Sequence, residues 1–183
     1  MPFAPGFDQH AYADKMLLEY SELGIDPARV LPQSFSIKDV QYWIKAHPQF
    51  AKQTVWLDPR GRQKNFTTSL EEMQAIKGQG INIISPPIPM LIQLNDSGDL
   101  EPSNYAKYAK QAGLEIITWT MESGNTIDPK NWLYANIAPI MDKPGKMLEV
   151  IDVLAQQIGV RGIFSDWPGT ITYYANCQNN LPK

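Results

Sequence analysis

Cysteine and histidine are scarce in this sequence, and each shortage excludes a class of chemistry. Cys177 is the only cysteine among 183 residues, so one chain can form neither an internal disulfide nor a thiolate metal cluster. His10 and His47 are the only histidines, and both are expected to face solvent near helix ends. Because histidine does acid–base work only when a partner positions it, neither is a candidate for catalysis.

Charge and long apolar runs are also limited. The 16 basic and 19 acidic residues give a net charge of -3, and no basic cluster could neutralise several phosphates, so nucleic acid is not an expected partner. The most apolar run, 81–94, is short and contains three prolines, which excludes a membrane span. Met1 is followed by Pro-Phe-Ala-Pro-Gly rather than by a signal-peptide pattern, so either the protein is cytoplasmic or its natural start lies elsewhere.

Apolar runs of strand length alternate with periodic segments of helix length along the chain. Asp8 is placed to cap the first helix, on which Tyr12, Met16, Tyr20 and Leu23 share a face, and Ser36 caps the second. This alternation predicts βαβ units and a parallel sheet buried on both faces. Helices are predicted over about 9–23, 37–46, 69–78, 102–112 and 146–158, with a short one over 170–176, and strands over 30–35, 54–58, 81–85, 114–120 and 160–166.

The number of strands indicates an incomplete barrel. An eight-stranded α/β barrel takes about 250 residues, whereas this chain has 183 and begins on a helix. We therefore predict an α/β fold that forms the C-terminal portion of a TIM-type (β/α)8 barrel. Residues 1–183 are expected to form a single partial barrel domain that is truncated on its N-terminal side.

Polar and aromatic side chains follow the predicted strands. The first strand ends in Gln33-Ser34-Phe35, the second in Asp58, the fourth in Trp119-Thr120 before Glu122, and the last in Asp166. In parallel α/β folds, ligands bind at the carboxyl ends of the strands. A face of aromatic rings with acids between them suits a small polar ligand that has some apolar surface.

Three blocks of the sequence resemble the glycerophosphodiester phosphodiesterase family, in the order in which that family has them. The block 30–39 is similar to the family's Gln-Ser-Phe segment, 111–120 to its block ending in Trp-Thr, and 159–168 to its closing block ending in Asp-x-Pro. The resemblance implies a barrel of the phospholipase C-like phosphodiesterase kind. It also implies hydrolysis of glycerophosphodiesters, the products of phospholipid deacylation, to glycerol 3-phosphate and an alcohol.

The same resemblance implies a catalytic apparatus that this chain lacks. In the family, two histidines act as acid and base, and carboxylates hold a divalent cation, calcium or magnesium. The family's His-Arg-Gly, Glu-x-Asp, His-Asp and Glu-x-Lys motifs are absent here. No catalytic residue and no metal ligand is therefore assigned to the chain, which is expected to be inactive alone.

The resemblance assigns substrate-binding roles to three residues. Phe35 and Trp119 correspond to the aromatic wall against the glycerol or the leaving group, and Gln33 lies beside them. Asp166 corresponds to the closing acid, with a supporting role. The alternatives are that both aromatic residues belong to the core and that Asp166 caps the last helix.

Asp58 and Glu122 are further candidates for a supporting role. Hard cations prefer carboxylate oxygens, but the two acids follow different strands, and the alternative is a solvated or helix-capping role.

Two other functions remain open from the residues. One is a non-catalytic fragment or binding module that pairs with another chain, or with itself, through exposed strand edges. The other is an unrelated α/β-barrel hydrolase that uses Asp58, Glu122 and Asp166. For location, the family resemblance favours a secreted or periplasmic protein.

Overall fold

Five parallel strands form the central sheet of the protein. The structure is a computed structural model that describes residues 6–63 and 66–179; the segment 1–5, over which no signal peptide is predicted, lies outside this part. The strands lie in the order β1-β2-β3-β6-β7, and every neighbouring pair is parallel. Their bounds are Gln33–Ser34 (β1), Val55–Leu57 (β2), Ile83–Ser85 (β3), Glu115–Met121 (β6) and Gly162–Ser165 (β7). All five predicted strands are therefore confirmed, four of them with shorter bounds and β6 shifted by one residue.

Six α-helices alternate with these strands in the described residues. Asp8 caps the first, since its carboxylate accepts a hydrogen bond from the Ala11 N–H at 2.8 Å, and Ser36 caps the second. A π-helical segment, Val153–Ile158, continues the fifth helix, so the helix predicted over 146–158 is confirmed in two parts. The bounds are Gln9–Glu22 (α1), Ile37–Ala46 (α2), Leu70–Gly78 (α3), Asn104–Gln111 (α4), Lys146–Asp152 (α5) and Pro168–Asn179 (α6).

A short antiparallel hairpin interrupts the alternation, and the sequence did not predict it. Strands β4 (Ile92–Leu94) and β5 (Leu100–Pro102) pair on either side of the turn at 95–98. The hairpin replaces the start of the helix predicted over 102–112, which instead begins at Asn104 after the cap Ser103. Each strand has only three residues and one contains a proline, so neither has the pattern of a strand.

The two faces of the sheet bury different sets of side chains. Trp56, Ile84 and Ile116 point toward the helices and belong to the large core. Val55, Ile83 and Ile117 alternate with them along the strands and form a separate small cluster on the other face, which we call the inner face. The residues two positions further along each strand therefore extend the inner face toward the carboxyl ends.

The predicted face of the first helix does not correspond to its buried face. Ala13 and Leu17 are the buried residues of α1, whereas Tyr12, Tyr20 and Leu23 are exposed. The buried positions are four residues apart, as expected for one face of a helix, and this face packs against α2. The larger apolar residues point away from that contact.

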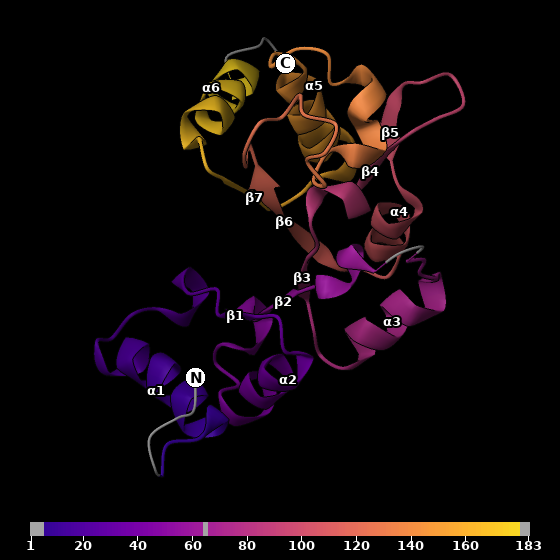
Figure 1. The fold of residues 1–183 in the computed structure, drawn as a ribbon. Coiled ribbons are helices and arrows are strands. Elements are labelled where there is room, and N and C mark those ends of the chain that lie inside the picture. Colours follow the sequence, from indigo (N-terminus) through magenta and orange to yellow (C-terminus); the bar gives the residue numbers. More distant parts are fainter. Residues whose placement is uncertain (1–5, 64–65, 180–183) are drawn as a thin grey trace.

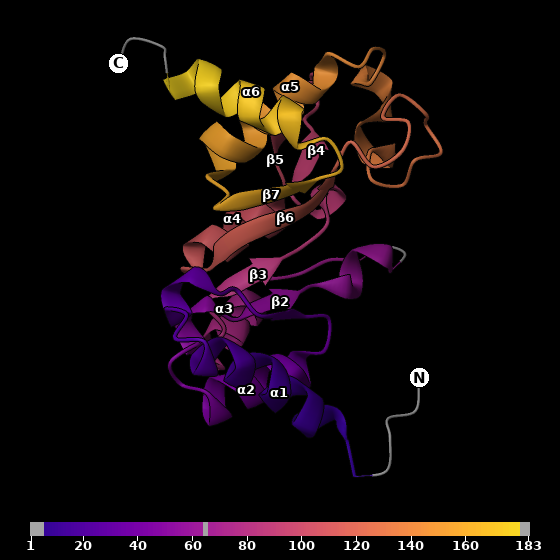
Figure 2. The ribbon, with the colours of Figure 1, turned by 90° about the vertical axis from the view of Figure 1, so that its left-hand side faces the viewer.

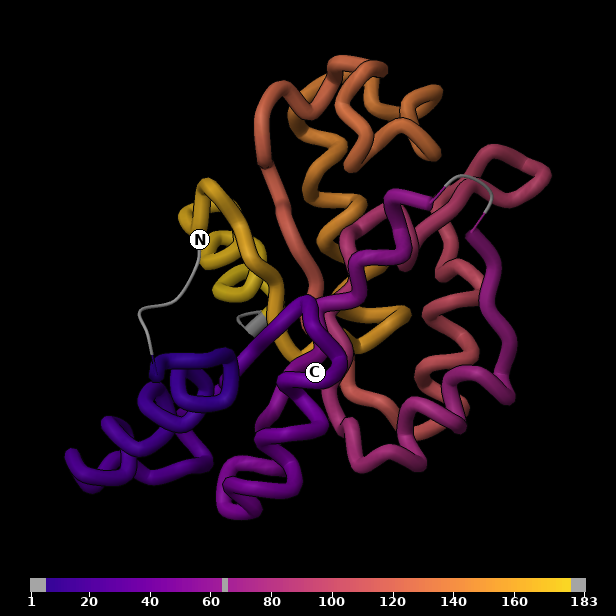
Figure 3. The backbone as a smooth tube through the Cα atoms, turned by 60° about the horizontal axis from the view of Figure 1, so that its bottom comes forward, coloured from indigo at the N-terminus to yellow at the C-terminus, as the bar shows by residue number. Residues whose placement is uncertain are grey.

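The helices lie around the outside of the sheet, and the inner face of the sheet is turned toward the opposite side. In Figure 2 the strands lie in front of α3 and α4, with α5 and α6 above and α1 and α2 below. Helices α1 and α6, from opposite ends of the chain, both lie to the left in Figures 1 and 3. Within the described residues β1 and β7 are the two edges of the sheet and do not pair. The fold is thus α/β with a mostly parallel sheet, and a closed barrel is not formed by this part of the chain.

No helix in the described residues is both long enough and apolar enough to cross a lipid bilayer.

Candidate functional site

A pocket of about 430 Å³ lies at the carboxyl ends of the parallel strands. It contains residues from both edge strands of the sheet, β1 and β7, and from β2 and β6 between them. Four of the six predicted site residues, Gln33, Phe35, Trp119 and Asp166, gather here. The pocket is lined by Gln33, Phe35, Leu57, Trp119, Thr120, Phe164, Ser165 and Asp166.

Two aromatic rings form the wall of this pocket. Phe35 and Trp119 meet edge to face, with ring centroids 5.8 Å apart and planes at 88°. The Trp119 indole N–H donates a hydrogen bond to the Ser85 carbonyl at 2.8 Å, which fixes the ring against β3. Phe35 is 53% exposed and so is not a core residue, whereas Trp119 is half-buried.

Polar groups at the pocket have free hydrogen-bonding capacity. The side chains of Gln33 and Asp166 are exposed and form no hydrogen bond with the described residues. Asp166 does not cap α6, because its carboxylate accepts no hydrogen bond from the described residues; Ser165 Oγ instead accepts one from the Trp167 N–H at 3.0 Å, just before the helix. An amide and a carboxylate beside two rings can bind the hydroxyl groups of a small ligand whose carbon atoms pack on the rings.

Leu57, Phe164 and Trp132 belong to this region and were missed from the sequence. Leu57 and Phe164 lie on strands and could have been found by alternation, since each shares a face with pocket residues of the neighbouring strand. Trp132 lies in the long loop after β6, and its ring centroid is 6.0 Å from that of Trp119. No local pattern in the sequence singles out Trp132.

Glu122 lies beside the pocket rather than in it. Its backbone is in the left-handed region, with φ 56°, which is uncommon for a residue other than glycine. The Glu122 N–H donates to the Tyr134 hydroxyl at 2.9 Å, and the Thr170 hydroxyl donates to the Glu122 carboxylate at 2.9 Å. Burial, together with the charges of Glu122 and Asp166, raises the pKa of Tyr134 to about 12. Glu122 thus ties the end of β6 to α6.

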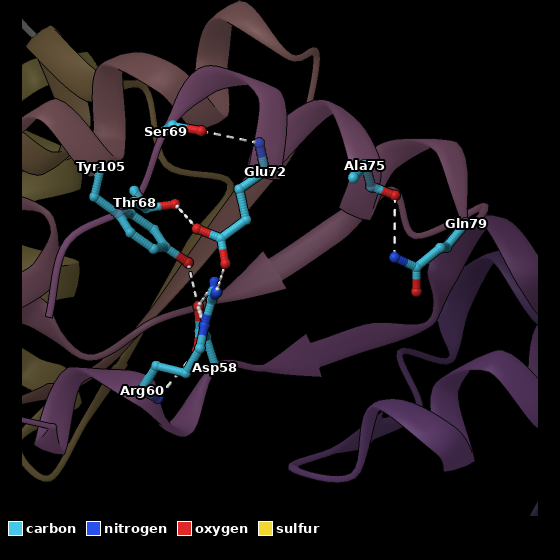
Figure 4. Close-up of polar contacts among 8 residues, drawn as sticks. All are labelled: Asp58, Arg60, Thr68, Ser69, Glu72, Ala75, Gln79 and Tyr105. Carbon is cyan, nitrogen blue, oxygen red and sulfur yellow. Dashed lines mark hydrogen bonds and ion pairs between the residues drawn. The ribbon is translucent and has the colours of Figure 1, made fainter.

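Asp58 is fully buried in a network of charged and polar groups on the loop that follows β2. Figure 4 shows Asp58, Arg60, Glu72 and Tyr105 pointing toward one another. The Asp58 carboxylate accepts hydrogen bonds from Arg60 Nη2 at 2.8 Å and from the Tyr105 hydroxyl at 2.8 Å. It also accepts from the Arg60 backbone N–H and so caps the turn Pro59–Arg62, whereas the solvated alternative does not hold.

The network perturbs the ionisation of its members. Burial and the neighbouring Asp58 charge raise the pKa of Tyr105 well above its usual value. Burial alone would lower the pKa of Arg60, but the hydrogen bonds and charge of Asp58 raise it above its usual value. The network therefore keeps Asp58 engaged away from the pocket, and Asp58, Glu122 and Asp166 do not share one pocket.

Gly61 packs the same loop against the segment after β3. A Cβ atom at this position would lie 2.6 Å from the Met90 sulfur and 2.8 Å from Pro87 Cγ. We expect Gly61→Ala to lower the free energy of unfolding by about 1–3 kcal/mol, because the proline ring cannot move aside as a flexible side chain can. Urea denaturation measures the change, with Gly78→Ala as control, since a Cβ at Gly78 meets nothing within 4 Å. Equal stability of the two variants would contradict the close packing.

The two histidines lie at the contact between α1 and α2. His10 is exposed, as predicted, and stacks on Tyr42 with ring centroids 4.1 Å apart. The expectation for His47 was wrong: it is 7% exposed, and its Nε2 lies 2.8 Å from the Asp14 carboxylate. Hydrogen bonds from His47 and Tyr42 lower the pKa of Asp14. In the sequence, the position of His47 before Pro48 has the pattern of a solvated helix end, but in the structure α1 covers this end of α2.

Metal-ligating side chains do not cluster in the part of the chain that the structure describes. No group of three or more His, Cys, Asp or Glu residues could hold an ion there. The pocket itself has one carboxylate, Asp166. This donor set does not fit the divalent cation that the family resemblance implies, because Ca²⁺ or Mg²⁺ needs several oxygen ligands.

Two solved structures have a similar fold. A glycerophosphodiester phosphodiesterase from Parabacteroides distasonis matches 98% of this chain with a TM-score of 0.56 and 13% identity. A protein from Silicibacter pomeroyi, assigned as a glycerophosphoryl diester phosphodiesterase, matches 91% with a TM-score of 0.56 and 20% identity. The chain spans 56% and 43% of these two proteins, about half of their length. At such identities the likeness establishes the fold alone.

A comparison of sequences identifies a closer relationship. No protein-family model matches the chain. A protein of Arthroderma benhamiae named "Extracellular protein" is 37% identical over 188 residues, which cover 98% of this chain and 75% of that protein. The chain therefore belongs to the same protein family as this extracellular protein of Arthroderma benhamiae.

Proposed function

We propose that this chain is the later part of a phosphodiesterase barrel that hydrolyses glycerophosphodiesters to glycerol 3-phosphate and an alcohol. The observation that carries the proposal is the meeting of Gln33, Phe35, Trp119 and Asp166 in one pocket at the carboxyl ends of the strands. These residues come from three strands that are far apart in the sequence. The similar fold of the two phosphodiesterase structures supports it.

The residues of the pocket bind and orient in this proposal. Phe35 and Trp119 pack against the carbon atoms of the glycerol moiety and exclude water from one side of it. The Gln33 amide and the Asp166 carboxylate are hydrogen-bonding partners for its hydroxyl groups. The acid, the base and the ligands of the divalent cation belong, in this proposal, to barrel segments that the 183 residues do not contain.

The purified 183-residue protein is expected to show no calcium- or magnesium-stimulated hydrolysis of glycerophosphocholine. A positioned acid, base and cation supply most of the rate acceleration in such reactions, and a protein that lacks some of these groups loses this acceleration. Release of choline, followed with each metal and with EDTA, measures the activity. Turnover that EDTA abolishes and metal restores would show that the chain carries its own catalytic apparatus.

A second candidate function is a binding module that pairs with another chain or with a second copy. Strands β1 and β7, which are the edges of the sheet in the described residues, favour it, as do the exposed Leu18 and Leu23 at α1 and Leu31 before β1. Sedimentation of the purified protein distinguishes the candidates, because this function requires a stable dimer or complex and the first does not.

We also propose that the protein is secreted. The support is the name of the Arthroderma benhamiae relative, which describes that protein as extracellular.

A further inference from the structure

A second pocket, of about 610 Å³, lies beside the loop that follows β2. Its walls come from this loop, from the segment between β3 and β4, from β4 itself and from the first turns of α4. It shares no lining residue with the pocket at the strand ends. The ring of Tyr105 lines it, while the Tyr105 hydroxyl points away to Asp58 (Figure 4). Its volume is within the range of about 300–1,000 Å³ that is typical of small-molecule sites.

Three aromatic rings supply the apolar surface of this second pocket. Phe66 and Tyr105 have ring centroids 6.3 Å apart and planes at 56°, and the Arg60 guanidinium carbon lies 4.9 Å from the Phe66 centroid. These two contacts hold the Phe66 ring in place. Tyr108 lies three residues after Tyr105 and therefore on the same side of α4, where it is half-buried. The rings offer surface on which the C–H groups of a ligand can pack.

The polar side chains of the second pocket have hydrogen-bonding capacity to spare. Gln93 Nε2 donates to the Glu101 carboxylate at 2.7 Å, and Asn136 Nδ2 donates to a backbone carbonyl of β4 at 2.6 Å. These bonds orient both amides, and their oxygens accept no hydrogen bond from residues 6–63 and 66–179. The Asn104 amide and the Tyr108 hydroxyl form no hydrogen bond with the same residues. Together these groups can both accept and donate, as pairing with hydroxyl groups requires.

The charges near the second pocket are paired with one another. None of the described residues that line it is charged. Of the charged residues beside it, Lys107 pairs with Glu101 at 3.6 Å, and Arg60 pairs with Asp58 and Glu72. An ionised ligand would therefore lose hydration without gaining a counter-charge, whereas a wholly apolar ligand would leave the amide oxygens unpaired. The lining fits a neutral ligand that has hydroxyl groups around an apolar C–H face.

We propose that this second pocket binds carbohydrate, as a neutral pyranose unit. The C–H face of the sugar ring packs on Phe66 and Tyr108. The sugar hydroxyl groups donate to the amide oxygens of Gln93 and Asn136 and form further hydrogen bonds with Asn104. The site is distinct from the pocket at the strand ends and does not depend on the phosphodiesterase function proposed above.

The test is a titration with neutral sugars, followed by saturation-transfer NMR. The probes are the methyl pyranosides of glucose, mannose and galactose, each beside the uronate in which a carboxylate replaces the primary alcohol. We expect at least one neutral glycoside to bind with a Kd of about 1–10 mM. Its uronate should bind at least about fivefold more weakly, because the pocket lacks a counter-charge. Saturation should transfer most strongly to the ring C–H protons that face the aromatic side chains.

Two pocket variants and two matched controls locate the binding. Tyr108→Ala removes a ring and Asn104→Ala removes an amide, and each should weaken the glycoside at least about fivefold. Tyr173→Ala and Asn176→Ala replace exposed residues of the same types on α6 and should leave the affinity unchanged. Trp119→Ala should leave it unchanged as well, since Trp119 does not line this pocket. Asn104 is exposed at the first position of α4, so its variant keeps the test valid even if Tyr108→Ala unfolds.

Every other outcome overturns the inference. It fails if no glycoside of the panel binds, if the uronates bind as tightly as their neutral parents, or if the pocket variants bind as well as their controls. A loss of binding in Trp119→Ala, with Tyr108→Ala and Asn104→Ala unaffected, would place the sugar at the strand ends. That result overturns this inference and leaves the proposed function standing.

Discussion

Replacing Asp58 by alanine is expected to lower the free energy of unfolding by about 3–5 kcal/mol, the typical effect of breaking a buried charge pair. The substitution removes the acceptor of the buried Tyr105 hydroxyl and leaves Arg60 with Glu72 as its remaining acidic partner. Chemical denaturation followed by circular dichroism measures the change. Asp96→Ala, on the exposed turn of the hairpin, is the matched control and should change stability by less than about 0.5 kcal/mol.

A double substitution separates the charge from the packing. Asp58→Leu combined with Arg60→Met removes both partners, so no buried charge is left uncompensated. The double variant should therefore be more stable than Asp58→Ala alone, although it loses the stacking of Arg60 on Trp56 and Phe66. A loss below 1 kcal/mol in Asp58→Ala would mean that the network contributes little to the fold.

For the phosphodiesterase proposed above, Trp119→Ala is expected to reduce kcat/KM by about 30- to 100-fold, or about 2–2.7 kcal/mol, while the protein remains folded. The indole is half-buried and forms both the wall of the pocket and the contact with Trp132. Steady-state kinetics on a glycerophosphodiester measure the effect. Trp167→Ala is the control, since Trp167 is 68% exposed and does not line the pocket.

Trp119→Phe tests which property of the indole matters. Phenylalanine keeps an aromatic surface but cannot donate the hydrogen bond to the Ser85 carbonyl. We expect a loss of less than tenfold if packing against the ligand dominates. A Trp119→Ala variant that unfolds would show instead that the residue belongs to the core.

The sequence predicted most of the helices and strands because their signals are local. Ser36 and Ser69 mark helix starts by the capping that the structure contains, and five apolar runs mark the strands of one sheet. The hairpin β4–β5 was missed because its pairing depends on a partner strand and not on a pattern within either strand. The predicted bounds of β1, β2, β3 and β7 were too long, because hydrogen-bonded pairing covers only part of each apolar run, whereas β6 has its predicted length.

The candidate site was predictable only where position on a strand determines it. Gln33, Phe35, Trp119 and Asp166 end strands, and the ends of parallel strands meet at one edge of the sheet. The buried position of Asp58 depends on its contacts with Arg60 and Tyr105. The one pattern in the sequence that indicated such a contact was the arginine two residues after the aspartate. Trp132 and His47 acquire their surroundings from tertiary contacts, which a single sequence does not encode locally.

The pocket joins the two edges of the sheet, which come from distant parts of the chain. Phe35 follows the first strand and Asp166 the last, with the three other strands between them. A ligand held by both edges can bind only when all five strands are in register. Ligand binding is therefore linked to cooperative unfolding of the whole sheet, and it should slow amide hydrogen exchange in the interior strands β2, β3 and β6 as well as at the edges.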